Sequence, residues 1–300
     1  MGISRRRKKI MKIGIIGTGM LGEAVGLHLL DVGYDVTVFN RTENKTERLK
    51  QKGASIAESP KQVAKDSDLI ITIVKDADAV NEVIFGSSGV ILGKHEGMCI
   101  ADMSTVNPNL TKKISENVAS NGVDYLEIPV MGGPNVAIDG KLVIMASGKK
   151  EVFEKFRKVF DSIAEQSFYL GDTGTAHSIK LAMNLQIAML ALSLSEGITL
   201  TKKAGLDPEI FLKILNSTYF KTGMSEGKAY KMIKESYSPT FTLANLKKDL
   251  DTINDAAESF DVELPMAKLA RKVYADAKDA GFGDIDYTGI IAYIKELSRK

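Results

Sequence analysis

A glycine-rich turn near the start of the chain limits the possible folds more than any other feature. The run IGIIGTGMLGEAVGLHLL, residues 13–30, spaces three glycines as G-x-G-x-x-G after an apolar segment and at the start of a helical pattern. In this setting the first glycine permits a tight turn, the second lets the backbone approach a pyrophosphate, and the third lets helix and strand pack closely. The alternative is a turn with no ligand. The predicted phosphate contacts come from Gly17, Thr18, Gly19, Met20, Leu21 and Gly22.

Short apolar runs alternate with helical patterns through the first half of the chain. This alternation is typical of an α/β fold in which a largely parallel, doubly wound Rossmann-type sheet has helices on both faces. A capping residue before a proline marks two helix starts, at Ser59-Pro60 and Asn107-Pro108. The predicted strands are residues 12–16, 35–39, 69–74, 98–102, 124–130, 142–147 and 166–169.

The pattern changes after Gly174, and no strand is predicted beyond it. Residues 176–204 predict one helix, about 45 Å long at a rise of 1.5 Å per residue. The remaining sequence predicts helices separated by prolines and glycines. We therefore expect a Rossmann domain at residues 11–170 and an all-helical domain at residues 171–300, with a long interdomain helix.

Charge gives no sign of a nucleic-acid surface. The formal net charge is +2, but five basic residues form one run from Arg5 to Lys9. Without that run, 35 basic residues stand against 38 acidic ones, so the folded body is mildly acidic. Residues 1–10 are expected to be a basic tail without function, with a nucleic-acid or membrane-surface role as the alternative.

The remaining composition favours a cytoplasmic protein with no membrane or nucleic-acid partner. Cys99 is the only cysteine, which excludes an intramolecular disulfide and suits a reducing compartment. The basic N-terminus lacks the apolar region of a secretory signal. The longest uncharged stretch, residues 181–195, is too short to span a bilayer. No metal site is expected.

The end of the second predicted strand indicates which dinucleotide binds. In VTVFNRTEN, residues 36–44, Asn40, Arg41 and Thr42 stand where a carboxylate would hold the 2′-hydroxyl of an adenosine ribose. A guanidinium at this place suits a 2′-phosphate instead. The sequence therefore predicts NADP(H) in preference to NAD(H). The alternative is a solvated surface arginine.

Two stretches at predicted strand ends could bind the substrate or the nicotinamide. ADMSTVNP places Ser104 and Thr105 after a strand, where ligands bind in this fold, although these residues could equally cap a helix. EIPVMGGPN places Gly132 and Gly133 after another strand, and their backbone N–H groups could form a small anion nest. A plain turn before Pro134 is the alternative.

A lysine on the long helix could supply the proton that a nicotinamide enzyme needs. In GDTGTAHSIKLAMN, Lys180 and Asn184 are four residues apart and share one helix face. Partial desolvation there would lower the pKa of Lys180 from about 10.4 towards neutrality. Alone, Lys180 would be a surface lysine. His177 is expected to face solvent or to pack incidentally.

Together these motifs resemble the β-hydroxyacid dehydrogenase family, which includes 3-hydroxyisobutyrate dehydrogenase and NADPH-dependent glyoxylate and succinic semialdehyde reductases. The resemblance runs from Met11 through nearly the whole chain. It rests on the glycine loop, on D-x-S-T at residues 102–105, on P-V-x-G-G at 129–133, on the segment from Gly171 to Asn184, and on NLKKDL.

The resemblance implies roles for individual residues. Lys180 would be the general acid in carbonyl reduction and the base in alcohol oxidation, and Asn184 would hold the substrate beside it. The cofactor would be lined by Val74, Lys75, Thr105 and Lys248. The substrate would be bound by Ser104, Thr105, Met131, Gly132, Gly133, Lys180, Asn184 and Asp249. The family also implies a homodimer or homotetramer.

Three residues depart from the family pattern. Leu21 precedes Gly22 in place of the usual residue, which is a mild change, and Met183 replaces the first of two asparagines. Met131 stands where the family usually has a serine that donates its hydroxyl to the substrate acid. The identity of the substrate is therefore the inference that Met131 most affects.

The sequence as a whole favours an NADPH-linked reductase of small aldehyde or keto acids such as succinic semialdehyde and glyoxylate. One alternative is an NADP-dependent 3-hydroxyacid dehydrogenase that acts oxidatively. An imine reductase fits less well, because relatives of that type lack the lysine found here at Lys180. A non-catalytic NADP-binding scaffold is the alternative from another class, and both Lys180 and Asn184 argue against it.

Overall fold

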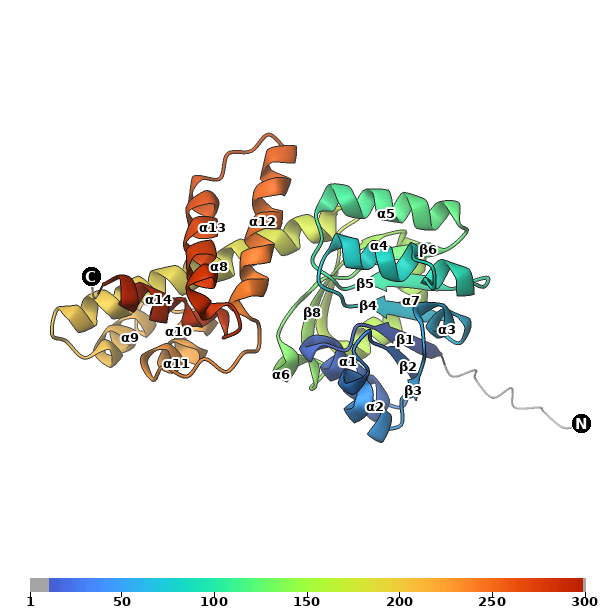
Figure 1. Ribbon diagram of the computed structural model, residues 1–300, viewed down its shortest axis with the longest axis horizontal. Helices are drawn as coiled ribbons and strands as arrows, with labels where there is room; N and C mark the ends of the chain where they lie inside the picture. Colours follow the sequence, from blue (N-terminus) through green and yellow to red (C-terminus); the bar gives the residue numbers. More distant parts are fainter. Residues whose placement is uncertain (1–10, 299–300) are drawn as a thin grey trace, which may run out of the picture. The chain divides into compact units, whose positions relative to one another are not determined.

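The computed structural model describes residues 11–298, so the predicted basic tail lies outside the described residues. The chain forms two compact units, of which the first ends at Lys180 and the second begins at Leu181. The first unit is built around a sheet, and the second consists of helices (Figure 1).

A nine-stranded sheet forms the centre of the first unit, in the order β3-β2-β1-β4-β5-β6-β8-β7, with β9 paired to β8. Neighbours are parallel from β3 to β6 and between β8 and β9, whereas β8 is antiparallel to both β6 and β7. The strands are β1 (Lys12–Ile16), β2 (Asp35–Phe39), β3 (Ser55–Ile56), β4 (Leu69–Thr72), β5 (Cys99–Asp102), β6 (Asp124–Glu127), β7 (Val130–Met131), β8 (Leu142–Gly148) and β9 (Ala164–Tyr169).

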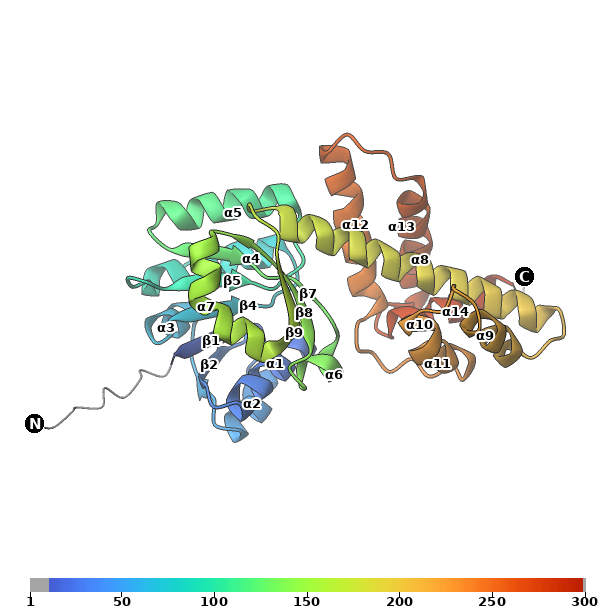
Figure 2. The same cartoon turned by 180° about the vertical axis from the view of Figure 1, so that it is seen from behind.

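Successive residues of the central strands enter two apolar cores, one on each face of the sheet. In β1, Ile13 and Ile15 belong to one core and Ile16 to the other, as the two-residue period of a strand requires. The first core is completed by α1 (Met20–Asp31) and α7 (Lys150–Ile163). The second is completed by α3 (Pro60–Lys65), α4 (Ala77–Phe85) and α5 (Pro108–Ser120) (Figure 2). Shorter segments are η1 (Glu43–Thr46), α2 (Glu47–Gln51), η2 (Val90–Gly93) and α6 (Pro134–Ala137).

The helix α8 (Thr175–Lys203) runs from the first unit into the second. By length and composition alone it could cross a membrane. Its buried residues Leu181, Ala188 and Ala191 belong instead to the apolar core of the helical unit. That unit also contains α9 (Pro208–Asn216), α10 (Gly223–Gly227), α11 (Ala229–Ile233), α12 (Leu243–Ser259), α13 (Pro265–Ala277), η3 (Lys278–Phe282), η4 (Tyr287–Gly289) and α14 (Ile290–Leu297).

The observed elements confirm the predicted fold class, and they differ from the sequence prediction in two places. The strand predicted at residues 124–130 is interrupted, because Pro129 has no N–H to give to a ladder, and β6 and β7 pair with different parts of β8. The two-residue strand β3 was not predicted, since so short a run carries no periodicity. The caps at Ser59 and Asn107 are confirmed, each side chain accepting a backbone N–H.

Candidate functional site

The glycine loop between β1 and α1 leaves room for a ligand at one glycine only. A Cβ on Gly17 would lie 2.2 Å from the carbonyl oxygen of Ile73, and one on Gly22 would lie 2.0 Å from that of Gly17. Gly17 also has a φ of 99°, in the left-handed region that favours glycine. At Gly19 no atom lies within 4 Å of the Cβ position. At Gly17 and Gly22 the backbone is therefore packed against other parts of the protein's own backbone. The open space at Gly19 fits a pyrophosphate.

Asn40 connects the glycine loop to the end of β2. Its Oδ1 accepts the N–H of Thr18 at 3.1 Å, and its Nδ2 donates to the carbonyl of Thr42 at 2.9 Å. The Oγ1 of Thr18 is buried and has no hydrogen-bond partner within residues 11–298. Arg41 is exposed, and none of the ion pairs found among these residues includes it. The loop therefore presents an unsatisfied hydroxyl and an uncommitted guanidinium, both of which suit an anionic dinucleotide.

A buried carboxylate shapes the turn at the end of β5. Asp102 accepts hydrogen bonds from the hydroxyl of Thr72 at 2.7 Å and from the N–H of Ser104 at 3.1 Å, and the hydroxyl of Tyr125 lies 3.3 Å away. The hydroxyl of Ser104 accepts the N–H of Val74 at 3.0 Å, so it holds β4 and β5 together at their ends. Neither Ser104 nor Thr105 caps α5, because Asn107 does.

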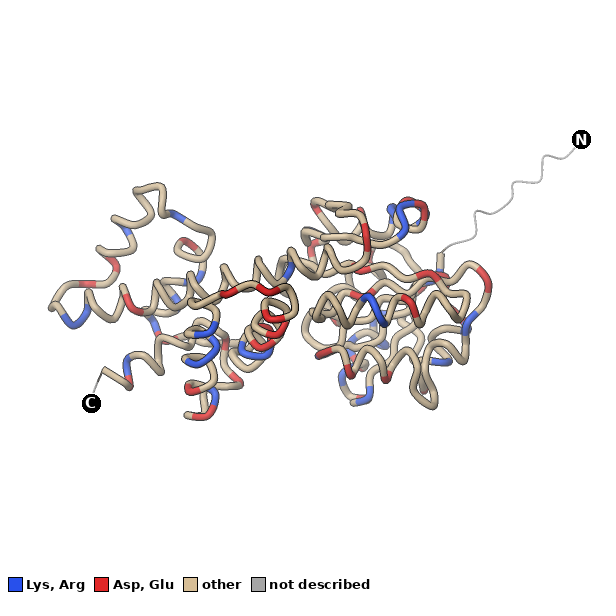
Figure 3. The backbone as a smooth tube through the Cα atoms, turned by 90° about the horizontal axis from the view of Figure 1, so that it is seen from above, with Lys and Arg blue, Asp and Glu red and all other residues tan. Residues whose placement is uncertain are grey.

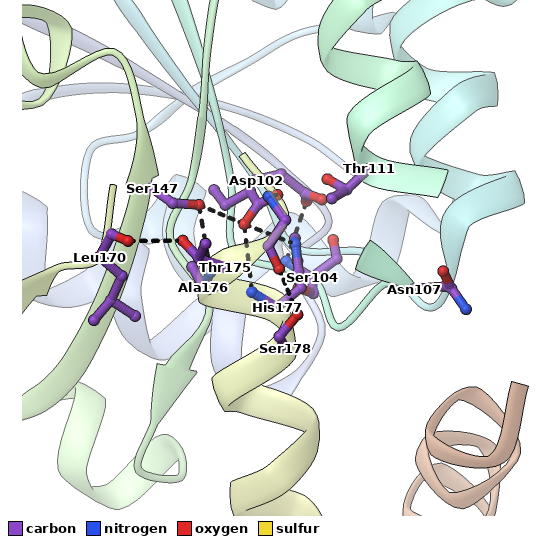
Figure 4. Close-up of polar contacts among 12 residues, drawn as sticks. Asp102, Ser104, Asn107, Thr111, Ser147, Leu170, Thr175, Ala176, His177 and Ser178 are labelled. Carbon is purple, nitrogen blue, oxygen red and sulfur yellow. Dashed lines mark hydrogen bonds and ion pairs between the residues drawn. The ribbon is translucent and has the colours of Figure 1, made fainter. Parts of the chain in front are cut away.

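Glu127 and His177 form a fully buried ion pair at the same edge of the sheet. Figure 4 shows His177 with Ser104 and Ser147 around it. The Nδ1 of His177 lies 3.4 Å from Oε2 of Glu127, too long and poorly aligned for a hydrogen bond, while Nε2 contacts the carbonyl of Ser104 at 2.9 Å. The hydroxyl of Ser147 donates to Oε2 of Glu127 at 2.5 Å. The expectation that His177 faces solvent or packs incidentally is therefore wrong: the ring is enclosed between an acid and a carbonyl.

The surroundings shift both pKa values towards the charged forms. Burial alone would raise the pKa of Glu127, but contact with His177, with the Ser147 hydroxyl and with the N–H of Gly174 outweighs it and lowers the pKa. Burial alone would lower the pKa of His177, but Glu127, then Asp102 and the carbonyl of Ser104, raise it above the ordinary 6.5. Each partner thus supports the charge of the other.

Lys180 lies one turn beyond His177 on α8. Its Nζ is 3.4 Å from the Sδ of Met131, the residue that replaces the family serine. The thioether is a weak acceptor for an ammonium group. Gly132, with a φ of 120°, and Gly133 follow Met131 directly and lead into α6. The structure therefore brings Lys180 next to the P-V-M-G-G segment.

Val74 and Lys75, two of the residues predicted to line the cofactor, follow β4. Val74 is half-buried, and its N–H is already bonded to Ser104. Lys75 is exposed, with Nζ 3.9 Å from the carboxylate of Asp76, which caps α4. Thr105 is half-buried after β5. These residues surround the same carboxyl edge of the sheet.

In the helical unit, three predicted residues form a second polar cluster. The Nδ2 of Asn184 donates to Oδ2 of Asp249 at 2.6 Å, and the Nζ of Lys248 lies 2.6 Å from Oδ1 of Asp249. Asn184 and Asp249 are buried. The Oδ1 of Asn184 is buried without a hydrogen-bond partner in the described chain. The amide is thus held by Asp249 and keeps one acceptor to offer.

Sequence reasoning missed Glu127 and Ser147. The signal was present, because Glu127 in the run DYLEIPV stands between the apolar residues Leu126 and Ile128. Charged residues are almost never fully buried unless they are paired. Such a residue in a central strand predicts a buried partner, which here is His177.

The ion pair predicts how stability depends on pH. His177, with a raised pKa, stabilises the fold in full below its unfolded value of about 6.5 and loses the effect as pH rises through the folded pKa. Glu127, with a lowered pKa, stabilises in full above about 4.5 and loses the effect as pH falls. The difference in Tm between the wild type and His177→Gln should therefore be largest between about pH 4.5 and 6.5 and should shrink in alkali.

Thermal unfolding across this pH range measures the effect. The groups that face His177 are Glu127 from β6, Asp102 and Ser104 from β5 and, beyond Glu127, Ser147 from β8. His95→Gln is the control, since His95 is exposed before β5 and contacts only backbone carbonyls. A His177→Gln difference that is the same at every pH would contradict the charged pair.

Both halves of the chain match family models. The NAD binding domain of 6-phosphogluconate dehydrogenase matches residues 12–171. The NAD-binding domain of NADP-dependent 3-hydroxyisobutyrate dehydrogenase matches residues 174–294. The two matches divide the chain just before α8 begins.

Several known proteins are similar to the chain over almost its whole length. Glyoxylate/succinic semialdehyde reductase 1 of Arabidopsis thaliana is 35% identical over 95% of this chain and 99% of that protein. Cytokine-like nuclear factor N-PAC of Xenopus tropicalis is 33% identical over 94% of this chain but only 53% of that protein. A 3-hydroxyisobutyrate dehydrogenase structure from Salmonella typhimurium shares the fold, with a TM-score of 0.86 and 24% identity over 94% of this chain and 99% of that one. The chain therefore belongs to the β-hydroxyacid dehydrogenase family and is an NAD(P)-dependent oxidoreductase of the hydroxyacid dehydrogenase and reductase type.

Proposed function

We propose that the chain uses NADPH to reduce small aldehyde or keto acids, such as succinic semialdehyde and glyoxylate, to hydroxyacids. The contact between Lys180 and Met131 carries the proposal, because it puts an ammonium group beside the segment assigned to the substrate. The name of the Arabidopsis relative supports the substrate class. The same residues would serve the oxidative direction, with Lys180 as base, so a 3-hydroxyacid dehydrogenase is the second candidate.

Each residue of the proposed site has a separate role in carbonyl reduction. A bound nicotinamide supplies the hydride. Lys180 donates its proton to the carbonyl oxygen as that oxygen becomes a hydroxyl. Thr105 and the backbone N–H groups of Gly132 and Gly133 hold the substrate carboxylate. Asn184, fixed by Asp249, offers its free Oδ1 to the substrate, and Ser104 keeps the strand ends in register.

For the cofactor, we propose a preference for NADP(H) over NAD(H). Arg41 is exposed at the end of β2 and has no ion-pair partner among residues 11–298, and the family model for the second half of the chain is that of an NADP-dependent enzyme. Asn40 and Thr42 shape the loop that presents Arg41. Lys75 and Lys248, each beside an aspartate, are assigned to the cofactor by the resemblance. The 2′-phosphate would be bound by the guanidinium as a charge-assisted pair.

We also propose a cytoplasmic homodimer or homotetramer with no nucleic-acid or membrane partner. Basic and acidic residues are interspersed along the backbone of each unit (Figure 3). Large apolar side chains are exposed near the end of α8, on α9 and just after it, where a second copy could cover them. They are Leu200, Ile210, Ile214, Tyr219 and Phe220. A monomeric mass by light scattering would contradict the assembly.

Replacing Arg41 tests the cofactor preference. Arg41→Ala should raise the KM for NADPH by about tenfold to a hundredfold, since a hydrogen bond to a charged group contributes about 1.5–3 kcal/mol. The KM for NADH should change little. Arg157→Ala is the control, because Arg157 on α7 is already paired with Glu154. Equal effects of Arg41→Ala on the two cofactors would disprove the assignment.

Replacing Lys180 tests the chemistry. Lys180→Met should lower kcat for succinic semialdehyde by about 10²–10⁴, the usual loss when a general acid is removed. NADPH binding, measured by fluorescence, should stay intact. Lys202→Met changes an exposed lysine on the same helix and should have no effect. Near-normal turnover by Lys180→Met would refute the role, and a wild type inactive on every two- to five-carbon aldehyde acid would favour the scaffold alternative.

Replacing Met131 tests the substrate pocket. Met131→Ser restores a hydroxyl to the carboxylate, so the KM for succinic semialdehyde or glyoxylate should fall by roughly tenfold with little change in kcat, as expected when uniform binding is added. Met131→Leu keeps the size without the hydroxyl and should leave the KM high. If serine alters neither constant for any acid, the side chain does not face the substrate.

A further inference from the structure

The first turn of α8 is capped by side chains from the sheet rather than by its own residues. Oε1 of Glu127 accepts the N–H of Gly174 at 2.5 Å, and Oε2 accepts that of His177 at 3.3 Å. The hydroxyl of Ser147 accepts the N–H of Ala176 at 3.4 Å. A carboxylate at a helix N-terminus satisfies free N–H groups and is stabilised by the helix dipole. Glu127 therefore anchors α8 to β6.

The His177 side chain adds a second anchor from the opposite direction. It leaves the same turn of α8 and reaches the carbonyl of Ser104, after β5 (Figure 4). Its other nitrogen faces Glu127. Ser104 is fixed in turn by Asp102. One helical turn is thus tied to the ends of β5, β6 and β8, and every charged atom of the connection is buried.

Burying an ion pair to hold a helix carries a large desolvation free energy. Taking two charges out of water costs several kcal/mol per ion before their attraction is counted, and apolar residues of similar volume are often as stable. Phe153, Phe156 and Phe160 already supply a large apolar core to this unit. The pair contributes something that apolar packing does not, namely a directed connection that fixes both the height and the rotation of the first turn.

Lys180 depends on that rotation. It lies three residues after His177, and its Nζ ends a long flexible side chain 3.4 Å from Sδ of Met131. No residue of α8 between His177 and Lys180 is fully buried, so the first turn decides where the side chain of Lys180 starts. In catalysis a misplacement of about 1 Å can cost about a hundredfold in rate.

We propose that Glu127 and His177 are positioning residues for Lys180: by fastening the first turn of α8 to the ends of β5 and β6, they set where its ammonium group meets the substrate carbonyl. The inference rests on the proposed function of Lys180. Neither residue touches substrate or cofactor in this role. Their effect passes through the helix, and it should appear in kcat rather than in cofactor binding.

The test compares Glu127→Gln, His177→Gln and the double variant Glu127→Gln/His177→Gln, all as full chains. Each single variant should lower kcat for succinic semialdehyde by roughly tenfold to a hundredfold, while the KM and fluorescence-measured affinity for NADPH stay unchanged. The double variant should lose less than the product of the two single losses, because two neutral amides no longer leave one charge unpaired.

Turnover is expressed per NADPH-binding site and measured at low temperature, so that a loss of folded protein does not count as a loss of rate. His95→Gln is the matched histidine control and should retain full turnover. If Glu127→Gln does not fold, Ser147→Ala removes only the hydroxyl shared by Glu127 and Ala176, and it should produce a smaller fall in kcat. A normal kcat per site in the folded variants, with only a lower Tm, would overturn the positioning role.

Lys180→Met separates this inference from the proposed function. If Lys180→Met is inactive and the Glu127→Gln and His177→Gln variants turn over normally, the positioning role fails and the function of Lys180 stands. If Lys180→Met turns over normally, the proposed function fails. Adding His177→Gln to Lys180→Met should cause no further fall in kcat when both proposals hold, since the group being positioned is already gone.

Discussion

The carboxylate of Glu127, buried at the edge of the sheet, is the interaction on which the site depends. It accepts the first backbone N–H groups of α8 and carries the charge that faces His177. Through it a helix of 29 residues begins at a defined height above strands that are otherwise apolar. The candidate proton donor Lys180 and the candidate substrate amide Asn184 both follow from where that helix begins.

The opposite side of the same sheet edge is organised by backbone geometry. Gly17 and Gly22 allow β1, α1 and the end of β4 to approach more closely than any side chain would permit. Asn40 then ties the loop to the end of β2, next to the exposed Arg41. A buried ion pair thus holds the long helix, and Arg41 is exposed at the end of β2. This distribution agrees with a site that must bind an anion without being filled by its own side chains.

Much of this arrangement could be predicted from the sequence because it rests on local signals. The glycine spacing, the period of the strands and the capping prolines act over a few residues, and they placed the sheet and α8 correctly. The resemblance assigned Lys180 and Met131 to the same site, but their contact is known only from the structure. The antiparallel pairing of β8 and the partner of His177 could not be predicted, because Glu127 and His177 are 50 residues apart and nothing local says which acid meets which base.

A single continuous helix carries both Lys180 and Asn184, although one ends the first unit and the other lies in the second. The geometry of the helix therefore fixes their spacing: the rise sets them about 6 Å apart along the axis, and the turn keeps them on one face. Substitutions can change what surrounds the two side chains, but not this spacing. A residue inserted between them would rotate one relative to the other by about 100° and separate donor from amide. The number of residues between Lys180 and Asn184 is thus under stricter physical constraint than the identity of those residues.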